Sequence, residues 1–342
     1  RDVGDINNEI KKGSPFTVRL KTPQYGKTSF EDLIYGNISV QNNEIDDFII
    51  ARSDGSPVYN LTNVVDDSLM EITHVIRGED HVSNTPKQIL IYHALGFKVP
   101  IFAHLPMILG EDKKRLSKRH GAAGVNEYES MGYQPDALLN YLALLGWNPG
   151  TEEEIFDLGS LVKNFDIRKV QKKSATYDQK KFNWISSQHL MKEDSDKVLN
   201  RLASIDPRWS DSRSQDNLIK IIDLMKPRSN SLTDLIDQSR YFFSSPKEFD
   251  SAQLQKIWKQ NTTEIIIELK SVLGVINSWV AIELESNFKS FMDQKGFGIG
   301  KVMKPMRFLI CGSLQGPSLF DLMELIGKEE SLKRINYAIN EF

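Results

Sequence analysis

The sequence predicts an α/β portion followed by an all-helical portion. Residues 59–112 alternate strand-like apolar runs with one helical segment, which is the pattern of a strand–helix–strand unit. From about residue 195 to residue 342 the pattern is helical throughout, for example in Leu218–Met225 and Glu264–Leu269, and no long β-rich run appears. A chain of 342 residues should hold two or three domains, each with its own core.

Composition and charge limit the classes of protein. A hydrophobic fraction of 40% with 26% charged residues is typical of a soluble globular protein. No apolar stretch is long enough to span a bilayer and no signal peptide opens the chain, so we expect a cytoplasmic protein or one imported into an organelle matrix. The net charge of −3 argues against indiscriminate coating of nucleic acid. The single cysteine, Cys311, is expected to be a buried core residue.

The first 58 residues are predicted to form strands and turns. Residues 15–21 alternate and end at Thr22 and Pro23, and residues 35–40 and 47–52 are short β-rich runs bounded by Gly and Asn.

Residues 59–112 carry the strand–helix–strand pattern. We expect a strand over residues 69–76, then a helix with Thr85 as N-cap and Pro86 at its first position, ending at Gly96. A second strand is expected over residues 101–109. In parallel sheets, ligands bind beyond the carboxyl ends of the strands, which is where Arg77 and the segment after residue 109 would lie.

A basic loop follows the second strand. Five basic side chains fall within residues 113–119, directly after the apolar run 105–109 and Gly110. Such a loop suits a polyphosphate, because lysines can neutralise the charge on a departing phosphate and the Ser117 hydroxyl can hold the shape of the loop. A solvated surface turn would have the same composition.

Three further side chains could bind an anionic ligand. Arg77 could clamp a carboxylate with two parallel donors, or it could form a structural pair with Glu79 or Asp80. Tyr59 and Asn63 lie four residues apart and could share a helical face, where they would serve either a ligand or packing and capping.

The segment after the loop is predicted to be helical. A helix over residues 135–145, closed by Gly146, is apolar nearly all round, so we expect it to be buried on all sides.

The basic loop and three other blocks resemble one enzyme family. Residues 115–119, Arg-Leu-Ser-Lys-Arg, resemble the KMSKS loop of class I aminoacyl-tRNA synthetases, in the Lys-Leu-Ser-Lys-Arg form of glutamyl-tRNA synthetases. Residues 56–67, 73–81 and 141–147 resemble other blocks of that family in the same order. The loop differs from the family pattern at Arg115, where the family usually has Lys. A planar guanidinium therefore replaces the compact charge of an ammonium.

The resemblance implies a fold class and a division into domains. The fold would be α/β, the C-terminal part of a class I Rossmann-type nucleotide-binding domain, followed by all-α stem-contact and anticodon-binding domains. Residues 1–58 would be the remainder of a connecting, acceptor-stem-binding insertion, residues 59–112 the second half of the catalytic domain, and residues 113–194 the KMSKS loop and stem-contact domain. Residues 195–342 would be an all-helical anticodon-binding domain of bacterial type, with a subdomain boundary near residue 246.

The start of the chain adds one expectation. It begins with Arg1 and contains no HIGH-like motif, which this family carries near the start of its nucleotide-binding fold. We therefore expect the N-terminal portion of the catalytic domain to be missing.

The implied function is that of a glutamate–tRNA ligase, which activates L-glutamate with ATP to glutamyl-adenylate and transfers it to the 3′ end of tRNA(Glu). Matching positions give the implied site residues. Lys118, Arg115, Ser117 and Arg119 would be catalytic; Lys118, His104 and the backbone of Ile108 would bind ATP; Tyr59, Asn63 and Arg77 would bind glutamate; Arg228, Arg307 and Leu319 would bind tRNA. The family pattern leaves specificity beside Leu319 uncertain because Gly316 lacks a side chain.

The resemblance also implies ATP with Mg²⁺, tRNA(Glu) as partner, and a cytoplasmic monomer without a membrane contact. None of the six histidines forms a spaced metal set, so these residues assign no other metal, and the presence of zinc stays open. Whether tRNA(Gln) is also charged stays open. Two alternatives remain: a catalytically inactive tRNA-binding fragment or paralogue, and glutamyl-queuosine synthesis, which the long helical segment disfavours.

Overall fold

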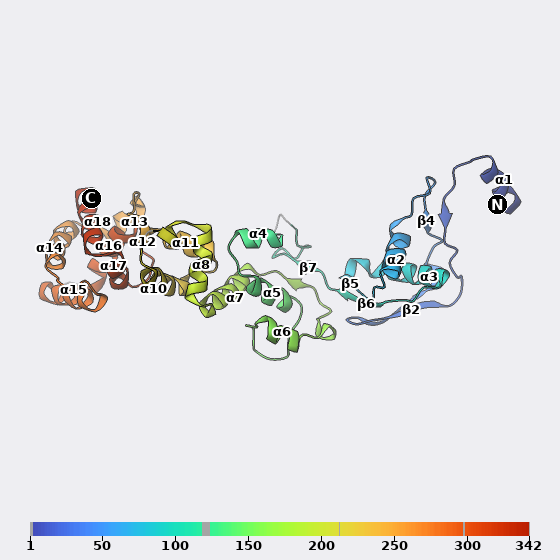
Figure 1. The fold of residues 1–342 in the computed structure, drawn as a ribbon, viewed down its shortest axis with the longest axis horizontal. Helices are drawn as coiled ribbons and strands as arrows, with labels where there is room; N and C mark the ends of the chain where they lie inside the picture. Colours follow the sequence, from blue (N-terminus) through green and yellow to red (C-terminus); the bar gives the residue numbers. More distant parts are fainter. Residues whose placement is uncertain (1–2, 118–123, 212, 297, 342) are drawn as a thin grey trace. The chain divides into compact units, whose positions relative to one another are not determined.

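The computed structural model describes residues 3–117, 124–211, 213–296 and 298–341, and it divides into two compact units. The N-terminal unit comprises residues 1–122 and 139–179, and the helical unit comprises residues 123–138 and 180–342. Figure 1 shows strands in the first and helices throughout the second. None of the described helices combines the length and the apolar character needed to cross a bilayer.

A four-stranded sheet organises the N-terminal unit. Its order is β3 (Gly36–Gln41), β2 (Lys27–Asp32), β6 (Ile101–Leu105), β5 (His74–Gly78). Strands β5 and β6 are parallel, with Arg77 opposite His104, and α3 (Thr85–Leu95) connects them (Figure 1). The predicted strand–helix–strand unit is therefore confirmed.

Several predicted boundaries in this unit are wrong. Helix α2 (Tyr59–Leu69) extends into the predicted strand 69–76, and β5 begins only at His74. The predicted strand 101–109 is divided into β6 and β7 (Ile108–Leu109), because Pro106 has no N–H to donate to a ladder. Thr85 is the first residue of α3 and not its N-cap, which is Asn84.

The N-terminal 58 residues hold more than the predicted strands. Helix α1 (Val3–Lys11) and strand β2 were not predicted, whereas β3 matches the predicted run 35–40. Strand β1 (Val18–Arg19) pairs with β4 (Ile49–Ala51), and η1 (Asn42–Glu44) follows β3. The buried face of β2 is Thr28, Phe30 and Asp32, so two of its three inward side chains are polar and the apolar alternation is lost.

The segment after the sheet is mostly helical. It contains α4 (Val125–Ser130), α5 (Pro135–Leu144), α6 (Leu158–Asn164), η4 (Ile167–Lys169) and β8 (Ala175–Thr176), which pairs with β7; η2 (Glu79–Asn84) lies earlier, between β5 and α3. The prediction that α5 is buried all round is wrong, because Leu139 and Leu142 are 41% and 45% exposed. Both line an apolar pocket of about 510 Å³. The apolar side chains on this face of α5 therefore line a pocket and are not covered by a neighbouring element.

Helices alone form the rest of the described chain from residue 195, as predicted. They follow α7 (Gln179–Lys192) and are α8 (Ser195–Ile205), α9 (Arg208–Asp211), α10 (Gln215–Met225), η5 (Lys226–Arg228), α11 (Leu232–Gln238), α12 (Arg240–Phe243), α13 (Ser251–Ile257), α14 (Thr262–Gly274), α15 (Ala281–Lys295), α16 (Ile299–Cys311), α17 (Leu319–Ile326) and α18 (Lys328–Glu341). One continuous hydrophobic cluster runs from Leu190 to Ala338 and includes Cys311, which is buried as expected.

The turn at Gly132 gives a test of packing in the helical unit. Its φ is +74°, and a Cβ there would lie 2.8 Å from the backbone nitrogen of Thr233. Gly132→Ala should lower the free energy of unfolding by roughly 1–2 kcal/mol because alanine disfavours the left-handed backbone. Displacement of the neighbouring backbone should lower it by about 1–3 kcal/mol more. Gly296→Ala is the matched control, because Gly296 has φ +64° and open space around it. Urea unfolding should show the larger loss at Gly132; equal losses would contradict the contact.

Candidate functional site

Arg77 lies near the carboxyl end of β5, and its guanidinium is held by three side chains. Its Nε donates to Nε2 of His104 at 3.2 Å, and its Nη2 donates to Oγ1 of Thr85 at 2.8 Å and to Oε1 of Gln88 at 2.9 Å. Within the described ranges it forms no ion pair with Glu79 or Asp80, so the structural pairing considered from the sequence is wrong.

The remaining nitrogen of Arg77 is unsatisfied. Nη1 is buried and has no hydrogen-bond partner among the described residues. Burial lowers the pKa of Arg77, and neighbouring Tyr59 and Asp67 oppose that shift. A buried N–H group without a partner costs free energy, and a carboxylate would satisfy this one while pairing with the charge. The geometry therefore suits an anionic ligand.

His104, on the neighbouring strand β6, fixes the position of Arg77. Its side chain is fully buried, and its Nδ1 lies 2.7 Å from Oδ2 of Asp32, whose other oxygen accepts the backbone N–H groups of Ile34 and Tyr35. Because Nε2 accepts from Arg77, the ring carries its proton on Nδ1 and donates it to Asp32. Both ring nitrogens are thus engaged. The expected contact of His104 with ATP does not fit this arrangement, and the ring instead positions Arg77.

Glu79 fixes the segment between β6 and β7. Its carboxylate accepts the hydroxyl of Tyr35 at 2.5 Å and the backbone N–H of Met107 at 2.8 Å. Burial, reinforced by Glu79, raises the pKa of Tyr35 to about 12, so the phenol stays a donor. Ile108, expected to face adenine, lies in β7, and its carbonyl accepts the N–H of Leu116 at 2.8 Å.

The basic loop begins as a tight turn. Arg115 bridges back to Leu109, the N–H of Gly110 donates to the carbonyl of Lys114 at 2.8 Å, and Lys113 has φ +61°. These bonds fix the direction in which the chain leaves β7.

Arg115 connects this turn to the end of β5. Its Nη2 lies 3.4 Å from Oδ2 of Asp80, only three residues beyond Arg77. The start of the loop therefore lies beside the end of β5, while the convergence of the whole loop with Arg77 on one ligand stays a prediction. Ser117 is half-buried, and the expected catalytic residues Lys118 and Arg119 lie outside the described residues.

Tyr59 and Asn63 lie one turn apart on α2, as predicted. Tyr59 is half-exposed and its hydroxyl lies 3.2 Å from Nδ1 of His81, while Asn63 is half-buried. Sequence reasoning missed Thr85 and Gln88, although their spacing of three on the helix after Arg77 places both on one face of its first turn.

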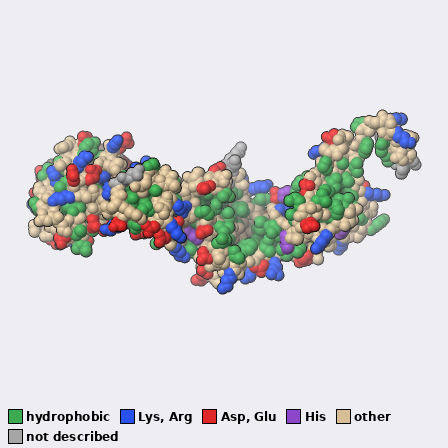
Figure 2. All heavy atoms as spheres, in the orientation of Figure 1, with side chains coloured by type: hydrophobic (Ala, Val, Ile, Leu, Met, Phe, Trp, Pro, Cys, Tyr) green, Lys and Arg blue, Asp and Glu red, His purple; other side chains and the backbone are tan. Residues whose placement is uncertain are grey.

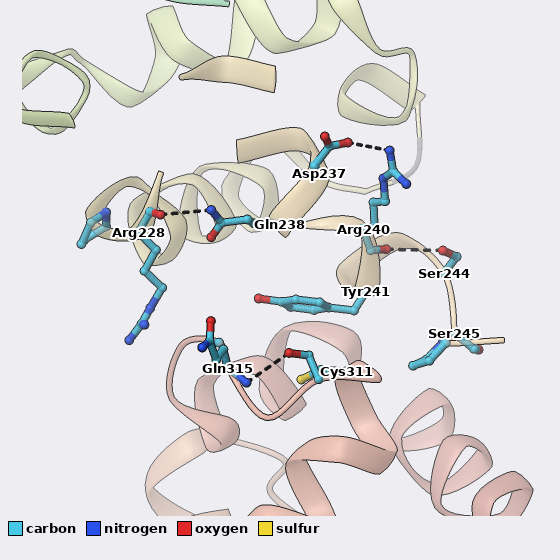
Figure 3. A pocket seen from close by; sticks show the side chains of 13 residues that line it. Arg228, Asp237, Gln238, Arg240, Tyr241, Ser244, Ser245, Cys311 and Gln315 are labelled. Atoms are coloured by element: carbon cyan, nitrogen blue, oxygen red, sulfur yellow. Dashed lines mark hydrogen bonds and ion pairs between the residues drawn. The ribbon is translucent and has the colours of Figure 1, made fainter. Parts of the chain in front are cut away.

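A pocket of about 770 Å³ opens in the helical unit, and we call it the large pocket. Its lining residues are Pro227, Arg228, Asp237, Gln238, Arg240, Tyr241, Ser244, Ser245, Pro246, Cys311, Ser313, Gln315 and Gly316. Figure 3 shows the ring of Tyr241 between Gln238 and Gln315, with Arg228 on the side to which the Tyr241 hydroxyl points. The carbonyl of Arg228 accepts from Gln238 at 3.2 Å, and its side chain is exposed.

Arg307 borders the large pocket behind Gly316. Its Nη1 is buried without a hydrogen-bond partner among the described residues, and a Cβ on Gly316 would lie 3.0 Å from that atom. The missing side chain at Gly316 thus allows Arg307 its position. Leu319, expected to contact tRNA, is only 1% exposed and belongs to the hydrophobic cluster. This burial leaves no side-chain surface for a base.

The surface charge of the helical unit is mixed. On the face drawn in Figure 2, acidic and basic side chains are interspersed over this unit. Recognition of an anionic partner on that face therefore depends on particular arginines and lysines, since no broad basic surface is present there.

Comparison with known proteins identifies the family. The catalytic domain of class I tRNA synthetases (E and Q) matches residues 2–184, and an anticodon binding domain matches residues 196–339. The chain is 38% identical over 338 residues to glutamate–tRNA ligase 1 of Caldanaerobacter subterraneus subsp. tengcongensis, covering 98% of this chain and 70% of that protein. It belongs to the glutamate–tRNA ligase family. It is 40% identical over 328 residues to the glutamate–tRNA ligase of Geotalea uraniireducens, covering 96% and 70%.

A solved structure agrees with this assignment. A glutamate–tRNA ligase from Elizabethkingia meningosepticum, crystallised in complex with its amino acid, superimposes with a TM-score of 0.86 at 33% identity. The match covers 99% of this chain and 71% of that one. The predicted class I fold with a helical anticodon-binding domain is confirmed.

The buried His104 predicts a pH dependence of stability. Burial lowers its folded-state pKa below the ordinary 6.5, against the effect of Asp32. As the pH falls, the imidazole is therefore protonated more readily in the unfolded chain than in the folded chain. The contribution of His104 to the free energy of unfolding is complete above about pH 6.5 and is lost as the pH falls through the lowered pKa. Urea unfolding at pH 7.5 and 5.5 measures it.

Two variants isolate this contribution. His104→Asn cannot take up a proton and should show a smaller loss of stability between the two pH values than the unsubstituted chain. His93→Asn is the control, because His93 is exposed on α3 and should leave the loss unchanged. An unaltered pH dependence in His104→Asn would contradict the buried neutral imidazole.

Proposed function

We propose that the N-terminal unit binds L-glutamate through Arg77, supported by Tyr59 and Asn63. The observation that carries this proposal is the buried, unsatisfied Nη1 of Arg77 at the carboxyl end of a parallel strand. Glutamate has two carboxylates, and the one that reacts must be free to approach phosphorus. Arg77 would therefore hold the other one and direct the reacting group toward the basic loop.

The reaction would be activation followed by transfer. A carboxylate oxygen of glutamate attacks the α-phosphorus of ATP, and the bond from that phosphorus to the pyrophosphate oxygen breaks. A ribose hydroxyl of the terminal adenosine of tRNA then attacks the activated carbonyl, loses its proton, and releases AMP. Lys118, with Arg115, Ser117 and Arg119, would hold the phosphates and neutralise the charge on the departing pyrophosphate. Positioning and charge supply most of the acceleration.

ATP would bring Mg²⁺ to this site. The described residues include no group of three His, Cys, Asp or Glu side chains that could hold a metal. Magnesium usually keeps several waters and binds substrate phosphates, so it requires no such group. Ile108 would then lie beside adenine, with its carbonyl already engaged.

We propose that the large pocket receives unpaired anticodon bases of tRNA(Glu). Arg228 and Arg307 offer guanidinium groups that can hydrogen-bond base edges and stack on them. The unsatisfied Nη1 of Arg307 supports this role, as does the exposure of Arg228. We further propose a cytoplasmic monomer, and the variants below test whether tRNA(Gln) is also charged. The relatives' ligase names disfavour an inactive tRNA-binding protein.

Arg77→Lys tests the glutamate site. Lysine keeps the charge but cannot occupy all three donor directions, so the KM for glutamate should rise roughly ten- to hundred-fold, the range for a charged hydrogen bond of about 1.5–3 kcal/mol. The KM for ATP should change little. Initial rates of tRNA glutamylation measure both.

Arg52→Lys is the matched control for that substitution. Arg52 is exposed, and its Nη1 donates to the Ser56 hydroxyl at 3.5 Å. The control should leave both KM values unchanged. An unchanged KM for glutamate in Arg77→Lys would remove Arg77 from the site.

Arg228→Gln tests the anticodon role. Loss of the guanidinium should lower kcat/KM for tRNA(Glu) roughly ten-fold, since a good arginine–base contact is worth about 1–3 kcal/mol, and should alter the ratio of tRNA(Gln) to tRNA(Glu) charging. Arg208→Gln is the control, because Arg208 pairs with Asp206 outside the large pocket. Equal kcat/KM values for Arg228→Gln and the unsubstituted enzyme would exclude the contact.

A further inference from the structure

A second pocket adjoins the large one in the helical unit, and we call it the small pocket. It has a volume of about 370 Å³ and is lined by Ser245, Pro246, Lys247, Phe249, Leu309, Lys333, Arg334 and Tyr337. Ser245 and Pro246 line both pockets, so the two share a wall. The two pockets are therefore direct neighbours on the helical unit.

An aromatic surface forms one side of the small pocket. The rings of Phe249 and Tyr337 are stacked, with centroids 6.4 Å apart and planes at 26°. Phe249 also packs against the buried Phe308 at 5.4 Å, which fixes its position. Tyr337 is 46% exposed. A flat, supported and accessible ring is the feature that binds a nucleic acid base by stacking.

Two exposed lysines flank this surface. Lys247 is exposed, and the side chain of Lys333 is 74% exposed with its ammonium 3.8 Å from Glu330. Glu330 also accepts from Ser245 and Arg334 at 2.5 and 2.8 Å, so its charge is already compensated. The lysines can therefore interact with an anion.

Arg334 is not part of that anion site. It is 3% exposed, and its Nη1 donates to the carbonyls of Tyr241 and Ile310 at 2.7 Å each. Arg334 therefore has a structural role: it connects α18 to α12 and α16.

We propose that the small pocket binds one further nucleotide of the same tRNA, next to the bases in the large pocket. Its base stacks on Tyr337, and its phosphate lies between Lys247 and Lys333. Continuity of the pocket walls and the positive charge favour an RNA segment, since an apolar peptide would leave the lysines unused. This inference rests on the proposed anticodon role of the large pocket.

Binding of intact tRNA(Glu) to the full chain tests the proposal. Fluorescence anisotropy over a salt series gives Kd and its salt dependence for each variant. Tyr337→Ala should weaken binding roughly five-fold or more, while Tyr337→Phe keeps the ring and should stay within about two-fold. Lys333→Ala should reduce the slope of log K against log salt by about 0.7, the value for one single-strand phosphate contact. Lys289→Ala, an exposed lysine on α15 outside both pockets, should not.

A transcript series locates the base. Removing single bases on either side of the anticodon should reveal one position at which Tyr337→Ala causes no further loss, because the stacking partner is already gone. Thermal unfolding of each variant separates loss of contact from loss of fold. If Tyr337→Ala destabilises the chain, Tyr337→Ser at a lower temperature gives the same comparison.

The outcomes distinguish this inference from the function it rests on. Weak binding by Arg228→Gln together with unchanged binding by Tyr337→Ala would overturn the inference and leave the anticodon role intact. Unchanged binding by both would overturn both. Equal losses in Tyr337→Ala and Tyr337→Phe would implicate the hydroxyl and overturn stacking.

Discussion

The buried contact between Asp32 and His104 is the constraint on which the N-terminal unit depends. A carboxylate in a protein interior is costly unless its oxygens are fully hydrogen-bonded. Asp32 meets that condition by accepting the N–H groups that follow β2 and both the backbone and ring of His104 on β6. The same contact fixes the tautomer of His104, which leaves Nε2 free to accept from Arg77. Strand pairing, the protonation of the His104 ring and the orientation of Arg77 are thus set together.

The helical unit uses a buried arginine for a similar purpose. Arg334 on α18 donates to the carbonyls of Tyr241 and Ile310, and so connects α18 to α12 and α16. Its Nε and Nη1 donate within the protein, whereas Arg77 and Arg307 each retain a buried nitrogen with no partner among the described residues. An unsatisfied buried donor is costly, and this is the ground on which we propose ligand-binding roles for Arg77 and Arg307 and a structural role for Arg334.

The sequence predicted the parts of this structure that depend on local patterns. The β5–α3–β6 unit, the place of Arg77 at a strand end, the helical segment from residue 195 and the spacing of Tyr59 and Asn63 all follow from periodicity. It could not predict the contact of His104 with Asp32, which lies 72 residues earlier on a strand whose buried face is mostly polar. The burial of Leu319 was missed as well, because an apolar residue beside a loop can face either side.

The replacement of lysine by Arg115 has a geometric explanation in the fold. The ammonium of a lysine is a single compact donor that Asp80 and a phosphate would have to share. A guanidinium can direct one nitrogen to each of them. Arg115 is 69% exposed and lies 3.4 Å from Asp80, so this ion pair contributes little to stability. Its effect is on position: the start of the basic loop stays next to the end of β5, where Arg77 would hold glutamate. The two anionic substrates would therefore be brought together by neighbouring groups on one strand end and one turn.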